Sequence, residues 1–288
     1  MNPAMIVKLA ALLSIVLVVI SVGLRSRPID VLALVREPIL GLKAILAMFV
    51  AVPAVVIAAT YILPFKPPVE AALIALSVSP MPPMLLRKGV KAGGQADYVI
   101  GLQVAMSVAS VIFAPIIVAI AGAIFKVDTD INMLAMWKTL IMTVGAPLFV
   151  GILIRRLWPN LAERLATPTG RIGLIMLMVA GVVILISSWP AVVLALGDGV
   201  LVLIAAIILF GLLVGHLLGG PDEGNRGALA VACAARHPGV AITIATSTFP
   251  AQQPMITGAV LVYLLASIVL AIPYMRWHGR HMTDLAKV

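Results

Sequence analysis

The stretch ACAARHPGVA, residues 232–241, carries the strongest signal for the fold of this chain. It lies within a long apolar run and places Arg236 and His237 directly before Pro238 and Gly239. Proline removes a helix hydrogen bond and clashes with the preceding turn, and a charge at the bilayer centre costs about 2.5–3.5 kcal/mol on insertion scales. Backbone broken in this way must be buried in protein or line a cavity, because lipid cannot bond it. The stretch therefore predicts a broken membrane helix at a central site.

The composition indicates an integral membrane protein. Of the 288 residues, 62% are hydrophobic and 11% are charged, whereas a soluble domain carries about 25% charged residues. The net charge of +9 does not indicate nucleic acid, because most Lys and Arg fall in short loops between apolar runs and act as topology signals. We expect residues 1–288 to form a single transmembrane domain in a plasma membrane of the bacterial inner-membrane type.

Nine apolar runs are long enough to span a bilayer as helices, which makes the fold class all-α. They cover residues 4–24, 38–63, 69–88, 97–125, 132–154, 171–189, 199–219, 224–249 and 254–276. The loops after the first, third and fifth runs and the C-terminal tail hold most of the Lys and Arg. The N-terminus is therefore expected outside and the C-terminus in the cytoplasm.

Two of the nine spans are interrupted by proline. The third contains Pro80, Pro82 and Pro83, and the eighth contains Pro238. The broken spans are five helices apart, so they cross the membrane in opposite directions. This arrangement predicts an inverted repeat, with halves at residues 1–125 and 132–276, in which the two breaks meet near the midplane.

Arg236 has three possible roles on the sequence alone. It can bind an anionic substrate with its planar fork of donors, it can hold the core together by bonding carbonyl groups freed by the two breaks, or it can lie in a cytoplasmic vestibule. His237 beside it is the one midplane group that titrates near neutral pH. It can therefore carry a proton with the substrate or simply bond it.

Other polar residues are expected to have simpler roles. His216 is predicted to be a hydrogen-bonded structural residue. Arg87 and Lys88 are predicted to be topology signals, and the alternative is that they attract anions to the inner vestibule. Cys233 is the sole cysteine, so no intrachain disulfide forms. A buried structural thiol is the favoured interpretation of Cys233, and a metalloid ligand is the alternative.

Several motifs resemble the bile acid:sodium symporter family in its nine-helix form. They are VGLRSRPIDVLALVREP (22–38), MFVAVPA (48–54), SVSPMPPMLL (77–86) and RGALAVACAARHPGVAIT (226–243). The resemblance covers nearly the whole chain. It implies a panel domain and a core domain, with two crossing helices in the core.

The positions at which the resemblance implies sodium ligands carry other side chains here. The crossing-helix glutamate and glutamine of the family fall on Ala232 and Arg236, and an earlier glutamine falls on Met48. The family's Ser-Asn pair falls on Leu85 and Leu86, and its following Ser and Thr fall near Val99 and Gln103. We therefore expect transport that does not depend on sodium.

The sequence thus predicts a secondary transporter of small organic anions that works by alternating access, as a facilitator, an exchanger or a proton-coupled carrier. No enzymatic activity, cofactor or metal site is expected, and the partners are the anion and membrane lipid. The alternative is a non-transporting receptor or structural homologue with the same fold. The predicted substrate-binding residues are Met48, Pro80, Met81, Pro82, Pro83, Met84, Gln103, Arg236, His237, Pro238 and Gly239. The oligomeric state does not follow from the sequence.

Overall fold

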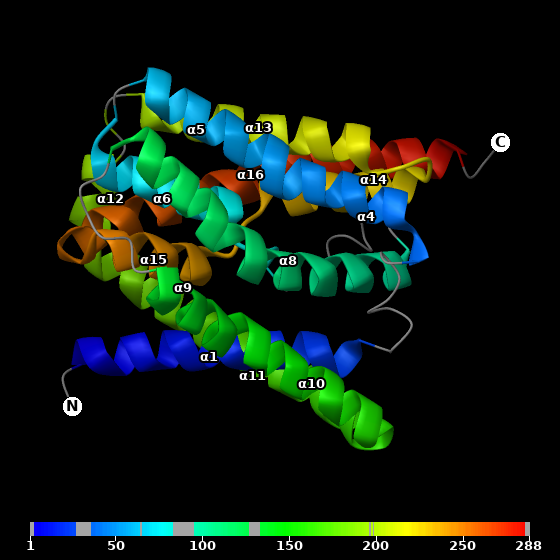
Figure 1. Cartoon of the computed structure of the whole chain (residues 1–288). Coiled ribbons are helices and arrows are strands. Elements are labelled where there is room, and N and C mark those ends of the chain that lie inside the picture. Colours follow the sequence, from blue (N-terminus) through cyan, green and yellow to red (C-terminus); the bar gives the residue numbers. More distant parts are fainter. Residues whose placement is uncertain are drawn as a thin grey trace.

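The computed structural model describes residues 3–26, 36–63, 65–82, 95–126, 133–195, 197 and 199–285, and the regular elements within them are helices (Figure 1). In chain order they are α1 (Pro3–Arg25), α4 (Pro38–Ile45), η1 (Leu46–Ala51), α5 (Val52–Ile62), α6 (Pro67–Val78), α8 (Ala96–Ile124), α9 (Met133–Leu140), η2 (Ile141–Gly145), α10 (Ala146–Leu157), α11 (Pro159–Ser187), α12 (Trp189–Ala195), α13 (Val200–Leu218), α14 (Glu223–Ala234), α15 (Pro238–Thr248), η3 (Pro250–Gln252) and α16 (Gln253–Leu285).

Within the described residues, eight helical segments are long and apolar enough to cross a membrane. They match eight of the nine predicted spans, and α14 and α15 together make one of them. The remaining span, predicted at 69–88, begins as the shorter apolar helix α6, and its part from residue 83 onward lies outside the described residues. The predicted all-helical membrane architecture is confirmed.

The boundary predicted between the fifth and sixth spans was wrong. The sequence placed a loop at 155–170, but α10 continues to Leu157 and α11 begins at Pro159. Proline suits the first turn of a helix because its missing N–H would be unpaired there. Glu163 and Arg164 are exposed on this added length of α11. The apolar pattern marks where the membrane begins, whereas the helix itself starts in the polar region before it.

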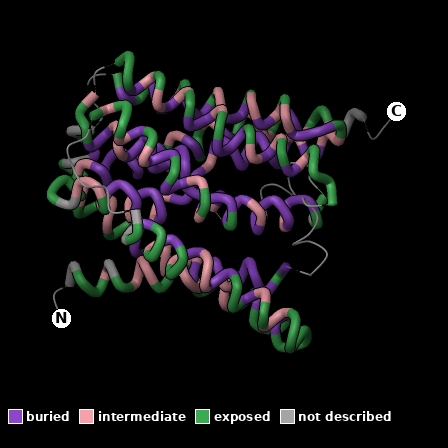
Figure 2. The backbone as a smooth tube through the Cα atoms, in the orientation of Figure 1, coloured by how far each residue is buried: buried purple, intermediate pink, exposed green. Residues whose placement is uncertain are grey.

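Most of the helices form two groups, whose buried side chains lie mainly in different hydrophobic clusters. One group, here called the panel, contains α1, α10 and α11, and α1 packs along both of the other helices. It lies at the bottom of Figure 1. The other group, here called the core, contains α4, η1, α5, α6, α8 and α13–α16, whose buried side chains share one large cluster. Residues of α9, η2 and α12 also contribute to this cluster. Figure 2 shows burial concentrated inside the core, with exposed residues along the outer faces.

Two spans contain a short π-helical segment just before a proline. In η1 the N–H of Val52 donates to the carbonyl of Ala47, five residues back, and Pro53 follows. In η2 the N–H of Ala146 likewise donates to the carbonyl of Ile141, five residues back, and Pro147 follows. A π-turn is a common way for a helix to accommodate a local disruption, and it often lies at a functional site.

The two broken spans meet in the core. The backbone N–H of His237, between α14 and α15, donates to the carbonyl oxygen of Pro80, beyond the end of α6, at 3.0 Å. α14–α15 is also the most buried of the eight membrane-length segments. The repeat boundaries, 1–125 and 132–276, stay a prediction.

The panel depends on a close contact between two glycines. A Cβ at Gly151 in α10 would lie 2.4 Å from the carbonyl oxygen of Ile20, and one at Gly23 in α1 would lie 2.5 Å from that of Leu148. Both neighbours are backbone atoms, so the two helices would have to separate.

We expect Gly151→Ala to destabilise the protein by about 1–3 kcal/mol, the usual cost of overpacking. The thermal unfolding temperature of the purified protein measures this effect. Gly181→Ala in α11 is the control, because nothing lies within 4 Å of the added Cβ there. An unfolding temperature lowered equally in both variants would contradict the close-contact explanation.

Candidate functional site

The candidate site is the place where the two breaks cross. α6 ends at Val78 and the chain continues extended from Ser79. α14 ends at Ala234, the chain is extended at Ala235 and His237, and α15 begins at Pro238. Within the described residues, α6, α14 and α15 therefore meet at two short non-helical segments that the His237–Pro80 hydrogen bond joins.

The prolines around this crossing leave carbonyl oxygens without a local donor. In the π register of η1, the Met48 carbonyl would accept from residue 53, but Pro53 has no N–H. The Ser79 carbonyl would accept from residue 82 or 83, and both are proline. The Ala234 carbonyl would accept from residue 238, which is also proline. Buried carbonyl groups of this kind need other donors.

Arg236 supplies donors to three carbonyl groups. Its Nε donates to Cys233 O at 3.2 Å, Nη1 to Ser79 O at 3.3 Å and Nη2 to Met48 O at 3.1 Å. The side chain is 2% exposed, and within the described residues it has no carboxylate partner. A single guanidinium thus joins α14, the end of α6 and the π-turn of the second span.

Two further side chains complete the bonding of the breaks. The Tyr263 hydroxyl in α16 donates to Ala234 O at 2.9 Å, and Gln103 Nε2 in α8 donates to Met81 O at 2.7 Å. Tyr263 and Ser79 were not among the predicted site residues. Tyr263 lies in an uninterrupted apolar run, so its role has no local signal in the sequence. Ser79 takes part through its carbonyl group, which every residue has.

His237 caps the N-terminus of α15. Its Nδ1 accepts from the N–H of Val240 at 3.4 Å, so the neutral ring carries its proton on Nε2. The His237 Nε2 and Gln103 Oε1 atoms are both buried and have no hydrogen-bond partner among the residues described. They belong to the two residues that donate hydrogen bonds to the carbonyl groups of Pro80 and Met81. Together the two atoms offer one donor and one acceptor.

Gly239 brings the panel against the crossing. A Cβ at this position would lie 2.5 Å from Ile15 Cδ1 of α1. The break is therefore in direct contact with the panel.

The remaining predicted site residues are placed as follows. Met48 contributes its carbonyl group, while its side chain is buried in the core cluster. Pro80, Met81 and Pro82 lie in the extended segment after α6. Pro83 and Met84, like Arg87 and Lys88, lie outside the described residues.

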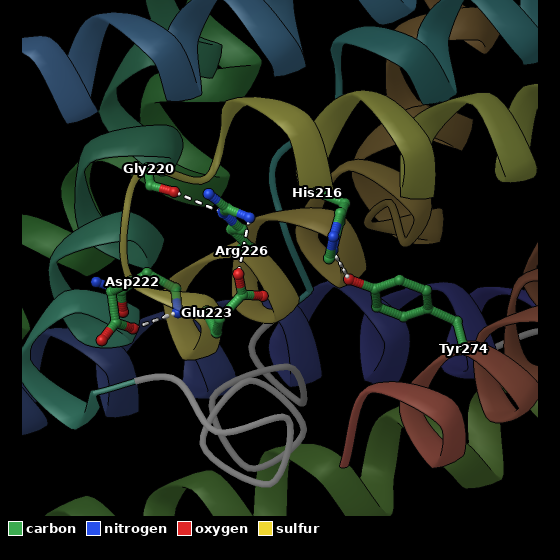
Figure 3. Close-up of polar contacts among 7 residues, drawn as sticks. His216, Gly220, Asp222, Glu223, Arg226 and Tyr274 are labelled. Carbon is green, nitrogen blue, oxygen red and sulfur yellow. Dashed lines mark hydrogen bonds and ion pairs between the residues drawn. The ribbon is translucent and has the colours of Figure 1, made fainter. Parts of the chain in front are cut away.

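Two other predictions concern a histidine and the cysteine. His216 Nδ1 lies 2.9 Å from the Tyr274 hydroxyl, which agrees with the predicted structural role (Figure 3). Cys233 is a free, buried thiol. The described part of the chain holds no group of three or more His, Cys, Asp or Glu that could bind a metal ion.

The turn from α13 to α14 sets the start of the broken span. Asp222 caps α14 by accepting from the N–H of Asn225 at 2.8 Å. Arg226 donates to the Gly220 carbonyl at 2.7 Å and pairs with Glu223 at 2.8 Å (Figure 3). These contacts fix the first turn of α14, and thereby the register in which Arg236 reaches its carbonyl partners.

We expect Arg236→Lys to lower the unfolding temperature although it keeps the charge. One amine cannot reach three carbonyl groups on separate elements, and each buried group left without a partner costs about 1–3 kcal/mol. Arg164→Lys, at an exposed position of α11, is the control and should unfold like the parent protein. A fully stable Arg236→Lys variant would show that positive charge alone is required.

Comparison with known proteins identifies the family. The model of the Sodium Bile acid symporter family matches residues 12–194, from α1 to α12. The match covers more than half of the chain and includes the first broken span, whereas Arg236 and the second broken span lie beyond it. No curated protein matches the chain. The chain belongs to the sodium bile acid symporter family of membrane transporters.

Proposed function

We propose that this protein is a secondary transporter that carries small organic anions by alternating access and does not use sodium. The observation that carries the proposal is the buried Arg236 guanidinium bonded to carbonyl groups of three elements. A fixed cation occupies the crossing and is available to balance a negatively charged substrate.

The residues at the crossing do not suit a sodium ion. A hard cation needs several oxygen ligands, and the carbonyl oxygens of Met48, Ser79 and Cys233 already accept from Arg236. Ala232 stands where the resemblance implies a carboxylate. A sodium ion beside the guanidinium would also meet like-charge repulsion that no nearby carboxylate among the described residues offsets.

The same arginine keeps capacity for an anion. A guanidinium has five N–H groups, and three are used here, so one on each terminal nitrogen remains. Such a pair matches the geometry of a carboxylate, sulfonate or phosphate. The free Nε2–H of His237 and Oε1 of Gln103 are available for further polar atoms of the substrate.

The contact between the panel and the crossing supports alternating access. Gly239 lies against Ile15 of α1, and apart from Val104 of α8 the two smaller hydrophobic clusters are made of panel residues. Movement of the panel against the core would open the crossing to one side at a time. We also propose the predicted orientation, with the C-terminus in the cytoplasm. A proton carried by His237 together with the substrate is one energy source that we propose for transport.

We expect uptake of an organic anion by protein reconstituted in vesicles to be unchanged when sodium is replaced with potassium or choline. The guanidinium is covalently attached, so its charge does not depend on the ions in solution. Initial uptake rates at matched ionic strength measure this, and empty vesicles give the background. A steep rise with sodium would refute the sodium-free mechanism.

The second possible function is a non-transporting receptor or structural homologue. It is favoured by the three bonds from Arg236 to the backbone, which can lock the core as well as receive an anion. The two functions differ in what the arginine does when a ligand is present.

For a transporter, Arg236→Gln should weaken anion binding at least about tenfold, as expected when a charge-assisted hydrogen bond worth about 1.5–3 kcal/mol is lost. Anion titration and unfolding temperature, measured on the same sample, separate binding from folding. For a locked receptor, Arg236→Leu should mainly lower the unfolding temperature, and the parent protein should show no flux. A well-folded Arg236→Gln variant with unchanged affinity would remove the substrate role of Arg236.

A further inference from the structure

The last turns of α16 extend beyond the hydrocarbon layer. This helix has 33 residues and is therefore about 50 Å long at 1.5 Å per residue, whereas the layer is roughly 30 Å thick. When the hydrocarbon layer is placed with one surface at Gln253, the first residue of α16, about 20 residues cross it and the other surface lies near Tyr274. The residues from Arg276 onward then lie at the level of the lipid headgroups, at the end of the bundle where α13 turns into α14.

This part of α16 carries an open hollow with a basic and aromatic lining. It is shallow and open, and it is lined by Pro273, Arg276, Trp277, Arg280 and His281, all from α16. The spacing of three and four residues puts them on one face of the helix. All five are exposed, and neither Arg276 nor Arg280 has an ion-pair partner among the described residues.

The aromatic part of the hollow is held in place. The ring of Trp277 stacks on His281, with centroids 6.2 Å apart and planes at 4°, and it also contacts His216 at 5.7 Å. His216 is in turn bonded to Tyr274, which ties α13 to α16 (Figure 3). The nearby carboxylate of Glu223 is paired with Arg226, which reduces its repulsion of an anion.

We propose that this hollow binds the phosphate group of an anionic lipid headgroup. Two arginines one turn apart present donor forks that suit a phosphate, and tryptophan is typical of the membrane interface. The site is separate from the crossing and does not depend on the proposed transport function.

The apolar face of α16 indicates a lipid and not a free phosphate. Leu265, Ile268, Val269 and Ile272 are all exposed, and their spacing continues the face that leads to Arg276. An acyl chain can lie along these side chains while its phosphate occupies the hollow. Basic pockets at the ends of membrane helices bind anionic headgroups in this manner.

The test is a titration of the full-length protein in neutral detergent with phosphatidylglycerol, followed by the unfolding temperature. We expect the lipid to stabilise the parent protein, and Arg276→Gln/Arg280→Gln to weaken the apparent affinity roughly 30-fold, given about 1 kcal/mol for each arginine near an anionic headgroup. Arg164→Gln/Arg171→Gln in α11 is the matched control, because it removes two exposed arginines elsewhere. It should respond like the parent.

Two further measurements test whether the bound molecule is an anionic lipid and whether loss of charge explains the effect of the Gln variant. Phosphatidylcholine and inorganic phosphate, at the same phosphate concentration, should not stabilise the protein. Arg276→Lys/Arg280→Lys keeps both charges but loses the donor forks, so its response should lie between those of the parent and the Gln variant. Such a partial response shows that loss of charge, and not damage to the helix, contributes to the effect of the Gln variant. Equal stabilisation by inorganic phosphate would overturn a lipid occupant, and an unchanged response of the Gln variant would overturn the site.

Discussion

The structure depends on hydrogen bonds from one buried guanidinium to backbone carbonyl groups that proline has left without donors. Pro53, Pro82 and Pro83 remove the N–H groups that would bond Met48 and Ser79, and Arg236 donates to both of these carbonyl oxygens. Without such donors, each carbonyl group would be buried unpaired in an apolar environment. The positive charge of Arg236, which has a high desolvation cost in a membrane, is therefore surrounded by carbonyl oxygens that carry partial negative charge.

This arrangement links the broken helices to the rest of the core. Tyr263 and Gln103 bond the carbonyl groups of Ala234 and Met81 on either side of the crossing, and His237 both caps α15 and donates its backbone N–H to Pro80. The crossing is therefore held by hydrogen bonds to backbone positions within the core. The panel contacts it through Gly239, where the absence of a side chain permits the approach of α1.

The arginines discussed above lie in two environments that differ in their exposure to water. At the crossing, one cation is shielded from water and bonded within the protein. At the end of α16, Arg276 and Arg280 are exposed beside a fixed cluster of rings, where the headgroup region can supply the counter-charge. The family relationship accounts for the membrane architecture, and Arg236, Arg276 and Arg280 lie beyond the residues that the family model matches.

The sequence was sufficient to predict the membrane class, most spans and the two breaks, because apolar length and proline act locally. It also pointed to Arg236, because a charge within an apolar run is visible without any structure. It misplaced the start of α11, since a helix that continues into a polar region leaves no apolar pattern. The tertiary structure alone decided which groups bond the arginine, because its partners are backbone carbonyl oxygens from residues as far away as Met48. Every residue has such an oxygen, so only the convergence of separate helices selects the ones that bind.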